Sequence, residues 1–171
     1  MTGVRSAGTL LLAAVVFLGG LFFGFRLLTA KADTSDPGPT CIDRTIEKGE
    51  KLTSNLVTVN VYNASTRAGL ANRVTINLQR KGFLGGEIGN SKSAVKPRKV
   101  AILTDDQTDP RVMLVAAQFA DTIAYSKPDI PVEGALIVVV GDDYTALEKD
   151  TPINMTSDRT ITVCVPVVQV P

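Results

Sequence analysis

The stretch VNVYNASTRAGLANRVTINLQRKGF, from Val59 to Phe83, decides the fold. Val59 and Val61 alternate with polar residues, which is typical of a half-buried strand. A polar turn follows and closes at Gly69, and Gly82 stands where a helix C-terminal cap is expected. Between the two glycines, apolar residues recur on one helical face, namely Leu70, Ala71, Val74 and Leu78. The stretch therefore predicts a strand, a turn and an amphipathic helix.

The turn between this strand and helix resembles a phosphate-binding loop only in its position. Its single glycine matches neither G-x-x-x-x-G-K-[ST] nor G-x-G-x-x-G. Asn63 and Ser65 can satisfy the first amides of the helix as local turn and cap residues. We therefore interpret the turn as structural. Anion binding at the helix start, with Arg67 nearby, is the alternative.

A second strand–helix–strand pattern follows the first. Residues 83–90 (FLGGEIGN) form a weak strand and Lys99–Leu103 a further one. Asp109 and Pro110 begin a second helix as N-cap and first helical residue. Its buried stripe is expected to be Val112, Val115, Ala116, Phe119 and Ile123, and the prolines at 128 and 131 end it.

The later apolar runs complete the expected sheet. Residues 135–140 (ALIVVV) suit a central strand covered on both faces. Residues 160–168 form a last strand that Pro166 confines to an edge or an end. We predict an α+β fold, a compact two-layer sandwich with a βαββαβ core that is ferredoxin-like or similar, with both helices on one face.

The amino-terminal segment is expected to cross a membrane. Nineteen residues from Ala7 to Phe25 carry no charge, and as a helix they would span roughly 28 Å. We expect a cytoplasmic segment at 1–6, a transmembrane signal anchor at 7–28 and a linker at 29–40. The alternative is a signal peptide that is cleaved after Ala32.

The two cysteines indicate the compartment of the remaining residues, 41–171. Cys41 and Cys164 stand near the two ends of this region, and their spacing fits neither a metal site nor a CxxC redox pair. A disulfide in an oxidising compartment fits best, and two unpaired buried thiols are the alternative. We therefore expect an extracytoplasmic domain, on the periplasmic or cell-wall side of the cell membrane.

The composition argues against most catalytic sites. Histidine is absent, which removes the commonest general base and the Ser-His-Asp and Cys-His nucleophile arrangements. The acidic clusters at 105–109 and 142–143 follow predicted strands and are interpreted as solvated turn carboxylates. From residue 33 onward the chain has 15 basic and 17 acidic residues, a net charge of −2 without a basic footprint for nucleic acid. We expect no enzyme activity and no catalytic, cofactor or metal site.

The ordered motifs resemble the C-terminal domain of LytR, the LytR_C family. The resemblance covers roughly residues 56–144 and includes the later IVVVGDDY, where a Val/Ile run precedes Gly-x-Asp and an aromatic residue. Its other residues are Val59, Val61, Asn63, Gly69, Leu70, Ala71, Gly82 and Phe83. The arrangement is similar to stand-alone, single-pass members in mycobacteria and their relatives. It implies a role in cell-envelope integrity and carries over no catalytic residue.

The leading hypothesis is a non-enzymatic, membrane-anchored envelope protein that binds another envelope protein or a cell-wall or lipid component, and no nucleic acid. Its candidate interaction surface is Arg67, Arg73 and Ile76. One alternative is a lipid or small-ligand domain with a groove between helices and sheet, lined by Leu70, Val74, Phe83 and Phe119. A remote alternative is a cell-wall hydrolase or transferase that uses Asp105 or Asp142.

Overall fold

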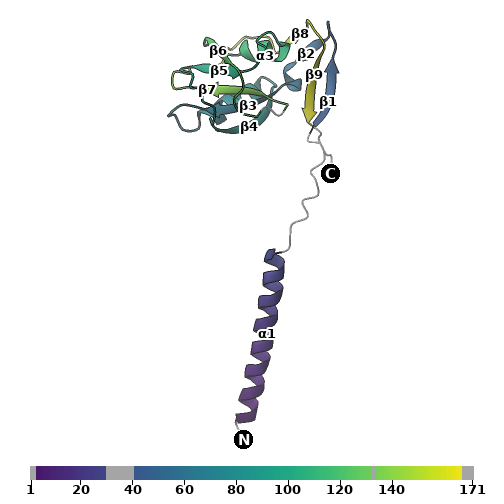
Figure 1. The fold of residues 1–171 in the computed structure, drawn as a ribbon, viewed down its shortest axis with the longest axis vertical. Coiled ribbons are helices and arrows are strands. Elements are labelled where there is room, and N and C mark those ends of the chain that lie inside the picture. Colours follow the sequence, from purple (N-terminus) through teal and green to yellow (C-terminus); the bar gives the residue numbers. More distant parts are fainter. Residues whose placement is uncertain (1–2, 30–40, 132–133, 167–171) are drawn as a thin grey trace. The chain divides into compact units, whose positions relative to one another are not determined.

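The computed structural model describes residues 3–29, 41–131 and 134–166. These residues fall into two compact units, one holding helix α1 (Gly3–Thr29) and the other holding everything from strand β1 onward (Figure 1). Residues 7–28, the predicted transmembrane anchor, lie within α1. Among the described residues, no helix has the length and apolar character that a membrane span needs. The predicted linker, 29–40, lies outside the described residues from residue 30 onward, and so does the cleavage site after Ala32.

A five-stranded sheet forms the centre of the domain. Its strands stand in the order β4-β3-β7-β5-β6 (Figure 1). They are β3 (Thr58–Asn63), β4 (Leu84–Asn90), β5 (Val100–Leu103), β6 (Ile123–Ser126) and β7 (Leu136–Val140). The run of Val and Ile in β7 is buried along four of its five residues, as its central place requires. This confirms the central strand predicted at 135–140.

Two βαβ units share this sheet. Helix α2 (Leu70–Arg80) joins the parallel strands β3 and β4, and α3 (Pro110–Ala116) joins the parallel strands β5 and β6. Strand β7 runs parallel to β3 and antiparallel to β5, so the second unit is turned end over end relative to the first. Right-handed crossovers then place both helices on the same face. The predicted α+β fold with a βαββαβ core is confirmed.

The strand order distinguishes this sheet from a strictly ferredoxin-like one. In the split βαβ pattern another strand lies between the two strands of each unit. Here β3 and β4 are direct neighbours, as are β5 and β6, and β7 separates the two units. The fold is therefore similar to the ferredoxin-like sandwich in its layers but not in its strand order.

The core lies mainly between the sheet and the helices. Val59 and Val61 from β3, Val74 from α2 and Val115 from α3 belong to one buried cluster. A smaller cluster on the opposite face joins β5 and β7 to the segments around Val95 and Ile130. Burial of these clusters supplies the largest favourable term for folding.

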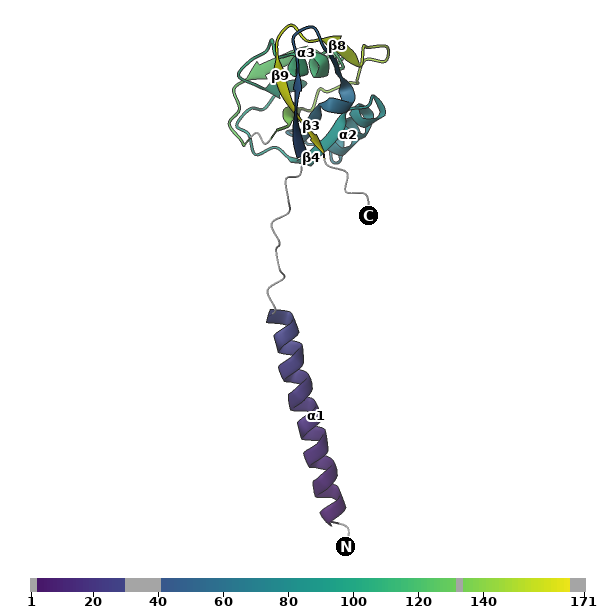
Figure 2. The ribbon, with the colours of Figure 1, turned by 90° about the vertical axis from the view of Figure 1, so that its right-hand side faces the viewer.

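Two short ribbons extend this core. Strand β1 (Cys41–Ile46) pairs antiparallel with β9 (Ile161–Pro166), and the two lie side by side in Figures 1 and 2. Strand β2 (Lys51–Thr53) pairs with β8 (Asn154–Thr156), and a 3₁₀ turn, η1 (Ser54–Leu56), precedes β3. Their apolar side chains, including Ile46, Leu52 and Val163, join the helix-side core.

The predicted disulfide is present. Cys41 on β1 is bonded to Cys164 on β9, with their Cα atoms 5.4 Å apart. Pro166 is the last residue of β9, which pairs only with β1 among the described strands, so its predicted position at a strand end is confirmed. The bond links the beginning and the end of the domain.

The helix boundaries largely follow the predicted signals. Gly69 precedes α2 with φ 71°, and Gly82 follows it with φ 88°, both in the left-handed region that favours glycine. The carboxylate of Asp109 accepts a hydrogen bond from the Arg111 amide, and Pro110 is the first residue of α3. The predicted C-terminal glycine of α2 and the predicted N-cap of α3 are therefore confirmed, whereas α2 starts after Gly69 without a side-chain cap from Asn63 or Ser65.

The predicted length of the second helix is wrong. Helix α3 ends at Ala116, Phe119 forms an isolated bridge with Leu147, and Ile123 begins β6. The apolar residues 112–123 do recur at helical spacing, and most are buried. Tertiary pairing of a short parallel strand overrides this periodicity.

We expect removal of the disulfide to destabilise the domain. It closes a loop with a sequence separation of 123 residues, for which the chain-entropy model gives about 5 kcal/mol. The double variant Cys41→Ser/Cys164→Ser should lose between about 2 and 5 kcal/mol of unfolding free energy. Urea unfolding followed by tyrosine fluorescence measures this, because all three tyrosines follow residue 41.

A variant on the same strand serves as the control. Thr45 is exposed on β1, so Thr45→Ser should change the unfolding free energy by less than about 0.5 kcal/mol. Reduction of the unaltered protein should reproduce the loss seen in the double variant. Equal stability of the double variant and the unaltered protein would contradict the expectation.

Candidate functional site

The turn after β3 is held by its own side chains. The Asn63 amide nitrogen donates to the Arg67 carbonyl at 2.8 Å. The Asn63 amide oxygen accepts from the Ser65 amide at 2.9 Å and from the Ser65 hydroxyl at 2.6 Å. The Arg67 amide donates in turn to the Ser65 hydroxyl. Asn63 thus organises the turn that positions α2.

The segment after β7 binds the same turn. The Asp142 carboxylate accepts from the Thr66 amide at 2.9 Å and from the Thr66 hydroxyl at 2.7 Å. The Arg67 guanidinium donates to the carbonyls of Tyr144, at 2.8 Å, and Asp142, at 3.3 Å. The Thr66 hydroxyl, the Thr66 amide and the charge of Arg67 hold the pKa of Asp142 below its ordinary value.

These contacts bear on anion binding at the turn. The amides of Ser65, Thr66 and Arg67 each donate to a side-chain oxygen of the chain itself. These three turn amides are therefore used in internal hydrogen bonds, which supports the structural interpretation of the turn. Helix α2 itself begins after Gly69 without a side-chain cap, so anion binding at the helix start stays an alternative.

Helix α2 presents a basic outer surface. Leu70, Val74 and Leu78 are buried, whereas Arg73, Ile76 and Arg80 are exposed. A hollow of about 500 Å³ lies between α2 and the segment 144–149. We define the basic face as the five cationic side chains that line this hollow: Arg67, Arg73, Arg80, Lys81 and Lys149.

The basic face has little acidic compensation. None of its five side chains forms an ion pair with a described residue, and Glu148 is the one acidic residue that lines the hollow. Three of the cations donate to neutral oxygens, and one of them is Arg80, which donates to the Asn77 amide oxygen at 3.4 Å. Arg67 donates to backbone carbonyls, and the Lys81 ammonium donates to the Lys149 carbonyl and the Thr151 hydroxyl.

The predicted interaction residues come together on this surface. Arg67 and Arg73 line the hollow, and Ile76, with 40% of its surface exposed, lies with Arg73 and Arg80 around a neighbouring depression. Arg73 and Ile76 stand on α2 and Arg67 in the turn before it, and the two neighbouring hollows share Arg73.

The alternative of a groove between helices and sheet named four lining residues, and the structure places them in the core. Leu70, Val74, Phe83 and Phe119 are at most 7% exposed and belong to the helix-side core. All four lie in the cluster where α2 and α3 pack against the sheet. Other residues line the hollow beside α2 and the depression next to it.

The acidic clusters have structural partners. Asp109 caps α3 and pairs with Arg111, and Asp143 pairs with Arg98. Asp106 binds Arg159, and the Thr108 hydroxyl and amide lower its pKa. With Asp142 holding Thr66, these carboxylates serve the fold.

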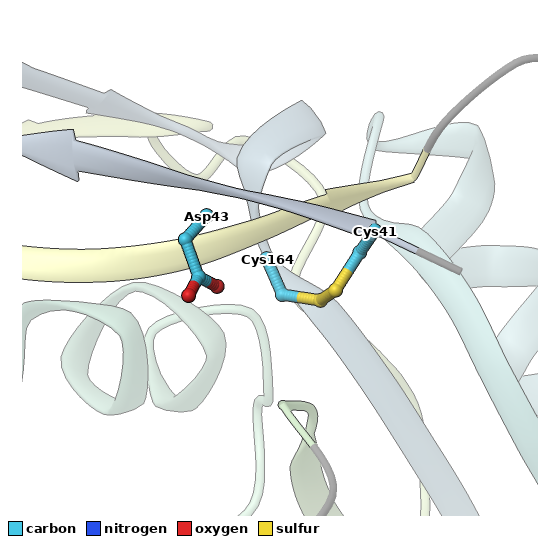
Figure 3. Close-up of side chains that lie close together, drawn as sticks. All are labelled: Cys41, Asp43 and Cys164. Carbon is cyan, nitrogen blue, oxygen red and sulfur yellow. A yellow bond between two sulfur atoms is a disulfide. The ribbon is translucent and has the colours of Figure 1, made fainter. Parts of the chain in front are cut away.

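One group of side chains has the composition of a metal site. Cys41, Asp43 and Cys164 place their potential ligand atoms within 4.8 Å of one another (Figure 3). Both sulfurs belong to the disulfide, however, so neither offers the thiolate that a soft metal requires. The group is a structural crosslink beside an exposed carboxylate.

The sequence did not reveal a second hollow, of about 530 Å³, on the sheet face opposite the helices. We call it the sheet groove, and it is lined by Asn60, Tyr62, Glu87, Ile88, Asn90 and Lys92. The available signal was the alternation in β3, where Asn60 and Tyr62 face away from Val59 and Val61.

This small α+β domain presents two hollows that could bind a ligand or partner, the basic face beside α2 and the sheet groove on the opposite face. The family model described as LytR cell envelope-related transcriptional attenuator, LytR_C, matches residues 56–144. The chain belongs to this family. The matched residues run from η1 to Tyr144 and contain both the Asn63 turn and its partner Asp142.

The chain also resembles part of a solved structure. The chain is similar to the soluble domain of a conserved hypothetical secreted protein from Mycobacterium marinum, with 20% identity and a TM-score of 0.44. The likeness covers 61% of this chain and 70% of that one. No curated protein matches the chain.

We expect the Thr66 contact to be measurable in the titration of Asp142. Because its folded pKa is lowered, this carboxylate stabilises the fold above its ordinary pKa of 3.8, and the contribution is lost as the pH falls through the folded pKa. Thr66→Val removes the hydroxyl, so the midpoint should rise toward the ordinary value. Carbon-detected NMR titration of the Asp142 carboxyl group measures it.

Asp158 provides an internal control in the same titration. Its pKa is lowered first by a hydrogen bond from Arg159, so Thr66→Val should leave its midpoint unchanged. An unchanged Asp142 midpoint in the variant would show that the Thr66 hydroxyl does not hold this carboxylate.

Proposed function

We propose that this chain is a non-enzymatic, membrane-anchored envelope protein whose extracytoplasmic domain binds a negatively charged envelope component and thereby helps to maintain envelope integrity. The component is another envelope protein or a wall constituent. The observation that carries the proposal is the basic face, five cations around one hollow with a single acidic neighbour.

The charge distribution supports an anionic partner. From residue 33 onward the net charge is −2, so the basic face is a local concentration and not a consequence of an overall basic chain. A concave surface of one sign concentrates ligands of the other sign and raises their association rate. The attraction weakens with salt, because charges beyond about 10 Å are screened at 0.1 M.

The composition of the helix face also suits recognition. Arg73 and Arg80 are seven residues apart on α2 and stand about 10 Å apart along its axis. Ile76 lies between them in the sequence, and its exposed side chain offers an apolar contact to a partner. Arginine is enriched among the residues that dominate binding energy at interfaces.

The absence of enzyme activity is supported by the structural roles of the carboxylates. Asp106, Asp142 and Asp143 each hold another segment of the chain, and Asp109 caps α3. The chain contains no histidine. The family match covers residues 56–144.

Membrane anchoring is proposed from the sequence, through residues 7–28. The disulfide supports an oxidising compartment for the domain. We expect the full chain to stay with the membrane fraction after alkaline carbonate extraction. Expression from residue 33 behind a cleavable signal peptide should release it, and recovery of the full chain in the soluble fraction would contradict anchoring.

The envelope role is tested in a deletion strain. Loss of the protein should increase antibiotic permeability, and the unaltered gene should restore it. The variant Arg73→Glu/Arg80→Glu should fail to restore it at equal protein level, because reversal of two charges repels an anionic partner. Permeability and surface-lipid profile are the measurements.

A matched variant separates the basic face from net charge. Lys48 and Lys51 are exposed on the β1–β2 side of the domain, and Lys48→Glu/Lys51→Glu changes the net charge by the same amount. It should restore the barrier fully. Normal permeability of the deletion strain would overturn the envelope role, whereas full rescue by the Arg73/Arg80 variant would overturn only the role of the basic face.

A further inference from the structure

The sheet groove exists because the two faces of the sheet are covered unequally. Helices α2 and α3 cover one face along its whole width. On the other face, segments around Val95 and Ile130 cover β5 and β7. Over β3 and β4 the groove opens instead, with side chains of both strands in its lining.

Asn60 is the key residue of this groove. It is only 7% exposed, and its amide oxygen accepts from the Glu87 amide at 2.8 Å. A Cβ on Gly86 would collide with that oxygen, so the glycine is what lets the Asn60 side chain lie flat against β4. The amide nitrogen has no hydrogen-bond partner among the described residues, which leaves a fixed donor in the lining.

The rest of the lining is balanced in charge and mixed in polarity. The Tyr62 hydroxyl donates to the Glu87 carboxylate at 2.7 Å, which orients the tyrosine ring. Ile130 and Pro131 add apolar surface to the lining. Glu87 and Lys92 are the only charged residues of the lining and cancel each other, so the groove has no net attraction for ions.

We infer that the sheet groove binds an uncharged saccharide unit of an envelope glycan. Saccharide hydroxyls donate and accept hydrogen bonds, which matches the amide of Asn60 and the carboxylate of Glu87. The C–H faces of a sugar ring need apolar surface, which Tyr62, Ile130 and Pro131 provide. A volume of about 530 Å³ lies within the range of small-molecule sites.

An extended peptide is the competing occupant, because β4 is an edge strand. The pairing of β3 with β4 shifts register between Val59 and Val61. Such an irregularity interrupts the regular row of backbone groups that an added strand would need, and it protects edges from pairing. The geometry therefore favours the saccharide.

Binding is tested with the full chain in a polyoxyethylene detergent, which contains no sugar. The probes are tetra-N-acetylchitotetraose and maltotetraose, and calorimetry measures their dissociation constants. We expect at least one of them to bind with a dissociation constant between about 0.1 and 5 mM. Absence of binding by both at about 10 mM would overturn the inference.

Variants assign any binding to the groove. Asn60→Asp keeps the size and the acceptor but replaces the free donor, and Glu87→Ala removes an exposed acceptor of the lining that the core does not need. Each should weaken binding at least about tenfold, or about 1.4 kcal/mol. Thermal unfolding checks that both variants remain folded, and undiminished binding by both would overturn the inference.

Two further outcomes are decisive. The variant Arg73→Glu/Arg80→Glu should bind the saccharide normally, because the basic face lies on the helix side of the sheet. Its failure to bind would assign the saccharide to the basic face and reject the groove. Displacement of the saccharide by an unstructured peptide of Val and Thr would identify β4 as a strand-pairing edge and would also reject the inference.

Discussion

The position of β7 between β3 and β5 is the constraint on which the rest of the structure depends. Each βαβ unit alone would leave one side of its sheet unpaired. Strand β7 pairs with both units, parallel to β3 and antiparallel to β5, and so converts two small ribbons into one five-stranded sheet. This pairing turns one unit end over end, and right-handed crossovers then bring both helices to one face.

The end of β7 also fixes the surface of α2. A Cβ on Gly141 would collide with the backbone carbonyls of Pro97 and Arg98, so only glycine allows β7 to leave the sheet at this point. Asp142 follows at once and binds Thr66, and the next carbonyls accept from Arg67. The Asn63 turn, the start of α2 and the hollow beside it are thus positioned by a strand that lies more than seventy residues further along the chain.

Local patterns predicted the parts of the fold in which local and tertiary preferences agree. The alternation in β3, the apolar run of β7 and the caps of α2 and α3 were all readable because each element is bounded by its own turn residues. The apolar stripe through Phe119 and Ile123 predicted too long a helix. A single long helix and a short helix followed by a parallel strand bury apolar residues at similar spacing, so the pattern does not separate them. Strands β1, β2 and β8 were missed because short ribbons with exposed faces have little periodicity.

The candidate sites show the same division. Helical periodicity places Arg73 and Ile76 outside and Val74 inside, but it cannot tell a core from a groove. The groove lined by Leu70, Val74, Phe83 and Phe119 therefore stayed an alternative until their burial was known. The role of Asn60 depends on the glycine that β4 places beside it, and no single-strand pattern contains that pairing.

The two proposed surfaces differ in chemistry and lie on opposite sides of the sheet. The basic face attracts through charge and weakens with salt, whereas the neutral sheet groove depends on fixed hydrogen-bond donors and apolar contact. If one envelope polymer carries both an anionic group and an uncharged saccharide, the first contact raises the effective concentration of the second, and two weak contacts hold the polymer more firmly than either alone. A small domain can stabilise an envelope in this way, because crosslinking requires only that two surfaces be occupied together.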